Sequence, residues 1–134
     1  MSEVTASLSE CLRAIQNAMP IHCELYKLDK EKSASISLSF SEIGSAKRTG
    51  GYFSVKTSVL AEIQVSIAES DPELKATEIA VAVVELVDKE TFGLSAKQAE
   101  SLQGVPGGTV ERFATWLVSW DQEFYVERFD FTAS

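Results

Sequence analysis

Residues 57–93 have the sequence TSVLAEIQVSIAESDPELKATEIAVAVVELVDKETFG, in which a strand pattern runs directly into a helix pattern. From 57 to 68 apolar and polar residues alternate, which is the period of a half-buried strand. Asp71 and Pro72 have the residue types preferred at a helix N-cap and first helical position, and Gly93 is typical of a helix end. We expect the helix to pack through one broad apolar face formed by Leu74, Thr77, Ile79, Val81, Val83, Val84 and Val87.

A second helix is predicted upstream, from Ser7 to about Met19. Ser7 and Glu10 have the spacing of a capping box, and Pro20 ends the helix because it has no N–H donor. Its apolar stripe comprises Leu8, Cys11, Leu12, Ile15, Ala18 and Met19. Cys11 is therefore interpreted as a small buried hydrophobe rather than a reactive thiol.

Two strands and a long connection are expected between these helices. Segment 21–28, IHCELYKL, is short and rich in strand formers, and segment 33–41, SASISLSFS, alternates without a break, so the charged run at 29–32 predicts a hairpin loop. Residues 42–56, EIGSAKRTGGYFSVK, have no stable period and contain three glycines. They are predicted to form a long, mobile connection that acts through contact.

The C-terminal region is expected to end the sheet. Residues 95–103 favour a short helical turn, and GVPGG at 104–108 favours a loop. One predicted strand face carries Val110, Arg112, Ala114, Trp116, Val118 and Trp120, and Phe113, Thr115 and Leu117 lie opposite, so this strand is buried on two sides or lies at a subunit interface. Asp121 and Gln122 are expected to interrupt it, and residues 124–131 to form a bent strand or a short tail.

These elements predict one domain over residues 1–134 with an α+β fold. The order α-β-β-β-α-β fits a single, mainly antiparallel sheet with helices packed on one face. The chain of 134 residues is long enough to bury a core without a metal or disulfide staple. It has no apolar run of membrane-spanning length and no secretory signal pattern, and its two cysteines fit a reduced, cytoplasmic protein.

The charge pattern argues against binding to duplex nucleic acid. The net charge is −8, whereas duplex-binding modules neutralise phosphates with basic residues. Residues 27–56 carry +3 and residues 57–134 carry −9. Opposite charges on different parts of one chain permit contacts between copies, and an ordinary solvated surface is the alternative.

Catalytic and metal-binding motifs are not found in the sequence. The chain has one histidine, His22, and the next residue, Cys23, points to the opposite side of a strand, so His22 is interpreted as an ordinary strand residue. Asp71, Glu73 and Lys75 have a spacing similar to that of some metal nucleases, but acids in a first helical turn are explained by the helix dipole. We expect neither enzymatic activity nor a cofactor or metal.

The second half of the chain resembles the tail-terminator, or tail-completion, proteins of long-tailed bacteriophages and prophages. The strand TSVLAEIQVSIAES runs into the amphipathic helix DPELKATEIAVAVVELVDK, and ATWLVSWDQEFYV follows with a WxxxWxQEF pattern. The N-terminal helix with its proline and the long connection before the central strand are also similar to that family. The resemblance covers most of the chain as an order of elements.

This resemblance implies a non-enzymatic structural protein of the virion tail, made in the host cytoplasm. Six copies would form a ring that caps the tail tube at its head-proximal end and contacts the head connector, with DNA passing through an acidic, non-adhesive opening. The residues expected to make contacts are Lys47, Arg48, Arg112, Trp116 and Trp120. For both tryptophans, a place in the core is the alternative. A second interpretation of the whole chain is a small acidic interaction protein, of the immunity or adaptor type, acting as a monomer or dimer.

Overall fold

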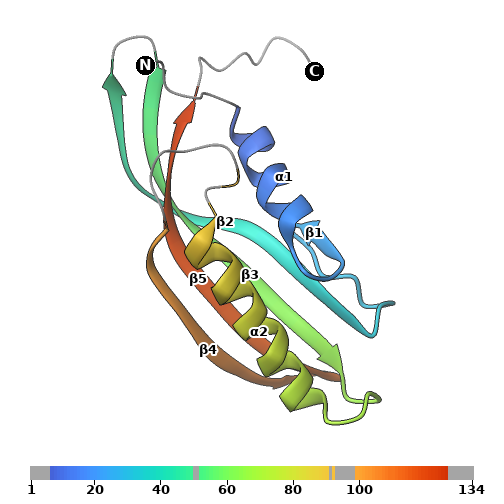
Figure 1. The fold of residues 1–134 in the computed structure, drawn as a ribbon. Coiled ribbons are helices and arrows are strands. Elements are labelled where there is room, and N and C mark those ends of the chain that lie inside the picture. Colours follow the sequence, from blue (N-terminus) through green and yellow to red (C-terminus); the bar gives the residue numbers. More distant parts are fainter. Residues whose placement is uncertain (1–6, 50–51, 91, 93–98, 127–134) are drawn as a thin grey trace.

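The computed structural model describes residues 7–49, 52–90, 92 and 99–126. Within these ranges the chain forms two helices and a five-stranded sheet, and so has the predicted α+β fold (Figure 1). The described elements include one strand more than expected. In chain order the elements are α1 (Leu8–Ala18), β1 (Cys23–Leu25), β2 (Ala34–Thr49), β3 (Tyr52–Ser66), α2 (Pro72–Lys89), β4 (Glu100–Val110) and β5 (Phe113–Val126).

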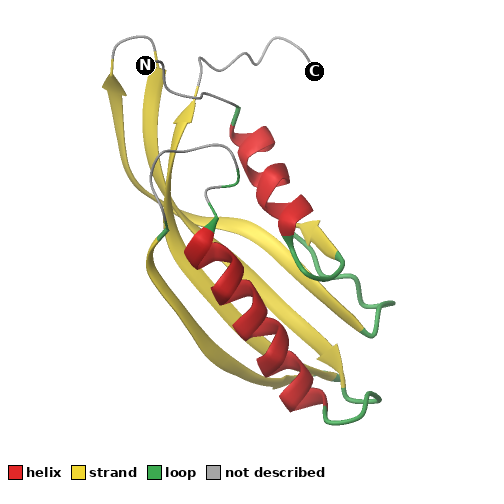
Figure 2. Cartoon of the chain, in the orientation of Figure 1, coloured by secondary structure: helices red, strands yellow, loops and turns green. Residues whose placement is uncertain are grey.

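The described sheet has the strand order β1-β2-β3-β5-β4. β2 with β3, β3 with β5, and β4 with β5 pair antiparallel, whereas β1 lies parallel to β2. Both helices cover the same face of this sheet (Figures 1 and 2). The prediction of a mainly antiparallel sheet with helices on one face is therefore confirmed.

The hydrophobic core lies between the two helices and the face that they cover. Cys11 and Ile15 of α1 and Val83 and Val87 of α2 are fully buried there. Their partners come from alternate positions of three strands, as the period-two pattern predicts. The largest are Ile36, Leu38, Val59, Ile63, Trp120 and Phe124.

The predicted ends of α1 are confirmed. The Ser7 hydroxyl accepts a hydrogen bond from the Glu10 N–H at 3.1 Å, which satisfies one of the free donors of the first turn. Met19 is the C-cap and has an extended backbone, as expected for the residue before Pro20. Neither described helix is long and apolar enough to cross a membrane.

The predicted sheet-facing side of α2 is wrong for two residues. Leu74 and Val81 are 57% and 58% exposed, whereas Ala76, Ala80, Val83 and Val87 face the sheet. α2 is apolar on more than one side, so periodicity alone does not choose among its faces. Packing against β3 and β5 selects the buried face, because the small side chains of Ala76 and Ala80 let α2 lie close to the sheet.

The boundaries of α2 are largely as predicted. Asp71 is the N-cap and Pro72 the first helical residue, but the Asp71 side chain makes no capping hydrogen bond and its backbone is left-handed, with a φ of 47°. The helix ends at Lys89 with Glu90 as the extended C-cap, so it stops earlier than the predicted end at Gly93, which itself lies outside the described residues.

The predicted hairpin between residues 21–28 and 33–41 is wrong. β1 is only three residues long and runs parallel to β2, with Cys23 opposite Ile36 and Leu25 opposite Leu38. Tyr26, with a φ of 63°, turns the chain out of β1, and the following residues carry it back to the start of β2. Two parallel strands need a connection that carries the chain back along the first strand, and the polar residues of this connection look the same in the sequence as those of a hairpin loop.

Residues 42–49 and 52–56 are strand rather than the predicted long connection. β2 continues to Thr49 and pairs with β3 from Tyr52, with register shifts between Phe40 and Glu42 and between Ile43 and Ser45. Residues 42–48 are exposed on both sides of the strand, so an alternation of apolar and polar residues is not needed there. The structure therefore does not bear out a long loop here; Gly50 and Gly51 lie outside the described residues.

Residues 100–108, predicted as the end of a helical turn and a glycine loop, belong to the edge strand β4, which runs from Glu100 to Val110. Pro106 is tolerated because β4 pairs only with β5 in the described sheet. A Cβ at Gly107 would collide with the Thr115 hydroxyl, and Gly108 has a φ of 74°, so both glycines allow close pairing with β5. Residues 95–98 lie outside the described ranges.

The last strand begins later and runs further than predicted. Val110 belongs to β4, and Glu111 and Arg112 form the turn into β5. Asp121 and Gln122 do not interrupt β5, because they pair with Ser58 and Thr57 of β3. The continuation predicted for residues 127–131 lies outside the described residues.

Candidate interaction surface

The far end of the β2–β3 hairpin rises past α1 in Figure 1. We call residues 42–48 of β2 and 53–56 of β3 the hairpin arm. Every arm residue on β2 is exposed, including Ile43 at 66%. β1 pairs with β2 only from Ile36 to Leu38, so the outer edge of β2 has no described strand beyond that point. An open strand edge offers unpaired backbone donors and acceptors to another chain.

The predicted contact residues Lys47 and Arg48 lie near the end of this arm. They are register partners of Ser54 and Phe53, and the Arg48 guanidinium carbon lies 5.5 Å from the centre of the Phe53 ring. This cation–π contact holds Arg48 against its partner on the neighbouring strand while leaving it exposed. The arm residues 42–56 carry a net charge of +2, because one acid stands against three bases.

The base of the arm is tied to the neighbouring strands. Lys56 Nζ lies 2.6 Å from Glu100 Oε2, and this hydrogen bond raises the pKa of Lys56. The Ser58 hydroxyl donates to Asp121 Oδ1 at 2.8 Å. These contacts connect β3 to β4 and β5 at the point where the arm begins.

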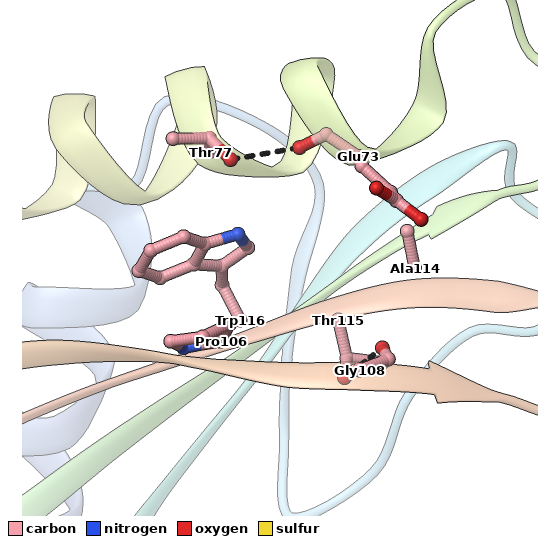
Figure 3. A pocket seen from close by; sticks show the side chains of 7 residues that line it. All are labelled: Glu73, Thr77, Pro106, Gly108, Ala114, Thr115 and Trp116. Carbon is pink, nitrogen blue, oxygen red and sulfur yellow. Dashed lines mark hydrogen bonds between the residues drawn. The ribbon is translucent and has the colours of Figure 1, made fainter.

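Trp116 lines a pocket between α2 and the β4–β5 pair. The pocket has a volume of about 270 Å³. The half-buried indole of Trp116 points toward Thr77 of α2 (Figure 3). Both threonine hydroxyls are used locally: Thr77 donates to the Glu73 carbonyl at 2.8 Å and Thr115 to the Gly108 carbonyl at 2.9 Å. The described residues that line it are Glu73, Thr77, Pro106, Gly108, Ala114, Thr115 and Trp116.

The residues that line this pocket are better suited to binding an apolar side chain than to catalysing a reaction. Glu73 is the only ionisable group among the seven lining residues, and it is exposed. A nucleophile with an adjacent base, or an acid–base pair, is not present in this set. Cys11 and Cys23 lie elsewhere in the core, where burial raises the pKa of each thiol to about 11.

Trp120 lies on the same face of β5 as Trp116 but belongs to the core. It is 1% exposed, and its indole N–H donates to Gln122 Oε1 at 3.2 Å. Of the two interpretations of this residue, the core position is therefore the one that the structure supports. Trp116, which is only half-buried, keeps a surface for contact.

The five predicted contact residues do not form one patch. Arg112 is exposed in the turn before β5, at the end of the sheet where Ser66 pairs with Phe113. Arg48 is at the opposite end, where Phe53 pairs with Val126. These ends are about 40 Å apart at about 3.3 Å per strand residue.

The exposed side of α2 combines acidic and apolar residues. Leu74 and Val81 lie exposed on it, and the helix carries four acids against two bases. The exposed acids are Glu73, Glu78, Glu85 and Asp88. Lys89 is bound to Glu85 at 2.9 Å, which further reduces the positive charge available on this side.

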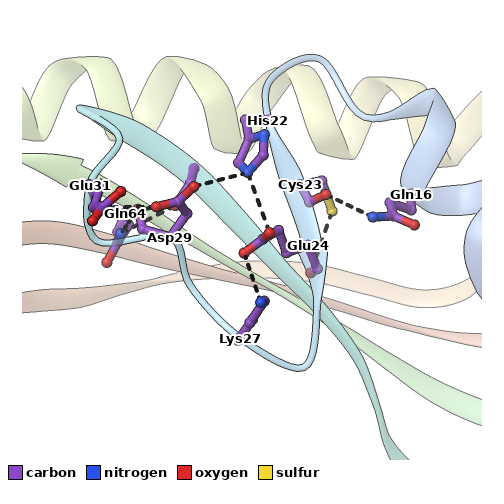
Figure 4. A network of polar contacts seen from close by, with 9 residues as sticks. Gln16, His22, Cys23, Glu24, Lys27, Asp29, Glu31 and Gln64 are labelled. Carbon is purple, nitrogen blue, oxygen red and sulfur yellow. Dashed lines mark hydrogen bonds and ion pairs between the residues drawn. The ribbon is translucent and has the colours of Figure 1, made fainter.

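Sequence reasoning missed a polar cluster around His22. His22 and Glu24 flank Cys23 and share one side of the strand, as alternation predicts, but Asp29 joins them from the following turn (Figure 4). The His-x-Glu spacing was a usable signal, whereas the position of Asp29 depends on the parallel return of the chain. No family model matches this chain, and no curated protein matches its sequence.

Proposed function

We propose that this protein is a non-enzymatic structural protein of the tail-terminator type. Copies would associate head to tail into a hexameric ring that caps the phage or prophage tail tube at its head-proximal end. The ring would contact the tube protein on one side and the head connector on the other. It would assemble in the host cytoplasm and remain in the virion tail.

The observation that carries this proposal is the hairpin arm. All fourteen residues of β5 pair with β3, including residues 53–56 of the arm, so the arm continues the sheet rather than forming a separate loop. It presents an open strand edge, the exposed Ile43 and the cations Lys47 and Arg48. Residues 42–48 of the arm contribute no side chain to the described core and are suited to contact with another chain.

The exposed side of α2 is the complementary surface in this proposal. It is acidic with two exposed large apolar residues, whereas the arm is basic with one, so the two surfaces attract and can exclude water where they meet. They are different surfaces of one chain, which makes the contact heterologous. A heterologous contact closes into a ring when the rotation per copy permits.

Charge reversal tests this contact. We expect the double variant Lys47→Glu/Arg48→Glu to lose the oligomer in sedimentation and native mass spectrometry at low ionic strength. Adding Glu78→Lys should restore part of it, because the reversed pair attracts again. High salt should weaken the parent assembly, since the screening length falls to about 3 Å near 1 M.

The matched control is Lys30→Glu/Lys32→Glu, which changes the net charge equally, to −12, on exposed residues outside the arm. It should leave the oligomer intact. Because a terminator can require its tube, each variant is also tested with isolated tail tubes. A strictly monomeric species in every condition, without binding to tube ends, would refute the ring and favour the small acidic interaction protein.

A further inference from the structure

We infer that His22, Glu24 and Asp29 form a binding site for a transition-metal ion of the Zn²⁺ type. This inference is independent of ring assembly. One ligand atom from each residue lies within 4.8 Å of the other two. His22 Nε2 is 3.3 Å from Asp29 Oδ2 and 3.9 Å from Glu24 Oε1.

The spacing suits a metal with short bonds. Zinc binds imidazole nitrogen and carboxylate oxygen at about 2.0–2.2 Å, so two ligands of a tetrahedral ion lie about 3.4 Å apart. The His22–Asp29 distance already matches this value. The His22–Glu24 distance must close by about half an ångström, which a part-exposed carboxylate side chain can provide by a small rotation.

Each carboxylate is oriented by a second contact. Asp29 Oδ1 accepts the Glu31 backbone N–H at 3.1 Å, which leaves Oδ2 facing His22. Glu24 Oε2 lies 3.9 Å from Lys27 Nζ, which leaves Oε1 facing the same imidazole (Figure 4). Outer contacts of this kind fix ligand direction in metal sites.

The backbone that carries the three residues is held by buried groups. The Asp29 carbonyl accepts hydrogen bonds from Gln64 Nε2 at 3.1 Å and from the Ser35 hydroxyl at 3.4 Å. Gln64 and Ser35 are 1% and 0% exposed. The His22 carbonyl accepts from the Ile36 N–H at 2.9 Å, so both sides of the cluster are anchored to β2 and β3.

The donor set selects the class of ion. One imidazole with two carboxylates favours zinc and neighbouring transition metals, whereas magnesium and calcium prefer oxygen ligands throughout. Three protein ligands leave a fourth position, and the part-exposed His22 places it on the solvent side. The adjacent Cys23 is buried on the other side of β1, so its thiol does not face the three ligand atoms.

His22 is the only histidine in the chain, so its ring gives a single set of NMR signals that reports the site directly. The protein, freed of any polyhistidine tag, is titrated with Zn²⁺ while imidazole signals and heat of binding are followed. We expect one equivalent of zinc to shift the His22 ring signals. The same concentration of Mg²⁺ should leave them unchanged.

Two matched variants separate this site from general surface binding. Asp29→Asn keeps an oxygen for the Glu31 N–H and so preserves the turn, but should weaken zinc binding at least tenfold. Glu31→Gln, which changes an exposed acid two residues away, should bind like the parent. His22 signals that do not move at millimolar zinc, or equal losses in both variants, would show that the cluster is an ion-pair network and overturn the inference.

Discussion

The orientation of α2 can be tested by truncating two valines that are two residues apart on one helix. Val83 is fully buried against the sheet, whereas Val81 is 58% exposed. Val83→Ala removes two buried methyl groups, worth about 0.8 kcal/mol each, and leaves a small cavity that adds to the loss. Alanine returns about 0.5 kcal/mol through its better helix propensity. We therefore expect the free energy of unfolding to fall by about 2 kcal/mol.

Val81→Ala is the control, because it changes the same atoms at an exposed position. Its expected effect lies within about 0.5 kcal/mol of zero, with a gain from helix propensity. Urea unfolding followed by circular dichroism, at a concentration where the protein is monomeric, should separate the two midpoints by about 1 M at equal slope. Val83→Asp should fail to fold, since an unpaired buried carboxylate costs several kcal/mol, and Val81→Asp should fold. Equal losses for the two alanine variants would refute this packing of α2.

Two further predictions concern the edge strand and the thiols. Gly107→Ala should destabilise the protein by about 1–3 kcal/mol because the new Cβ collides with the Thr115 hydroxyl, whereas Gly44→Ala, whose nearest contact would be at 3.6 Å, should be nearly neutral. Thermal unfolding compares the stability of the two variants. If Thr115→Ala restores the stability of Gly107→Ala, the collision is identified as the cause. Burial raises the thiol pKa of Cys11 and Cys23 from 9.0 to about 11, so the folded state holds these protons more tightly. The contribution of these thiols to the free energy of unfolding is fully present below pH 9 and is lost as the pH rises toward 11, by up to about 2–3 kcal/mol per thiol. Urea unfolding at pH 9 and pH 11 should show this drop in stability, and the Cys11→Ala/Cys23→Ala variant should largely lack it.

Several local features of this protein follow from its sequence alone. The capping pair Ser7 and Glu10 and the following Pro20 determine both ends of α1, because each acts within one helical turn. The alternation in residues 57–66 correctly identifies the side of β3 that faces the core, since successive strand residues point to opposite faces, but it does not predict that Gln64 on the other side is also buried. The core position of Cys11 also follows from its place on the apolar stripe of α1.

Features that depend on which segments meet were decided by the tertiary structure. Residues 42–48 carry no alternating pattern, yet they form a strand because β3 supplies hydrogen-bonding partners along them. GVPGG has the composition of a loop, but the glycines allow it to lie close against Thr115 of β5. His22 and Asp29 come together only because the chain returns to pair β1 parallel to β2. In each case backbone pairing between strands outweighs the local preference of one segment, and the composition or periodicity of that segment alone does not show which strand it will pair with.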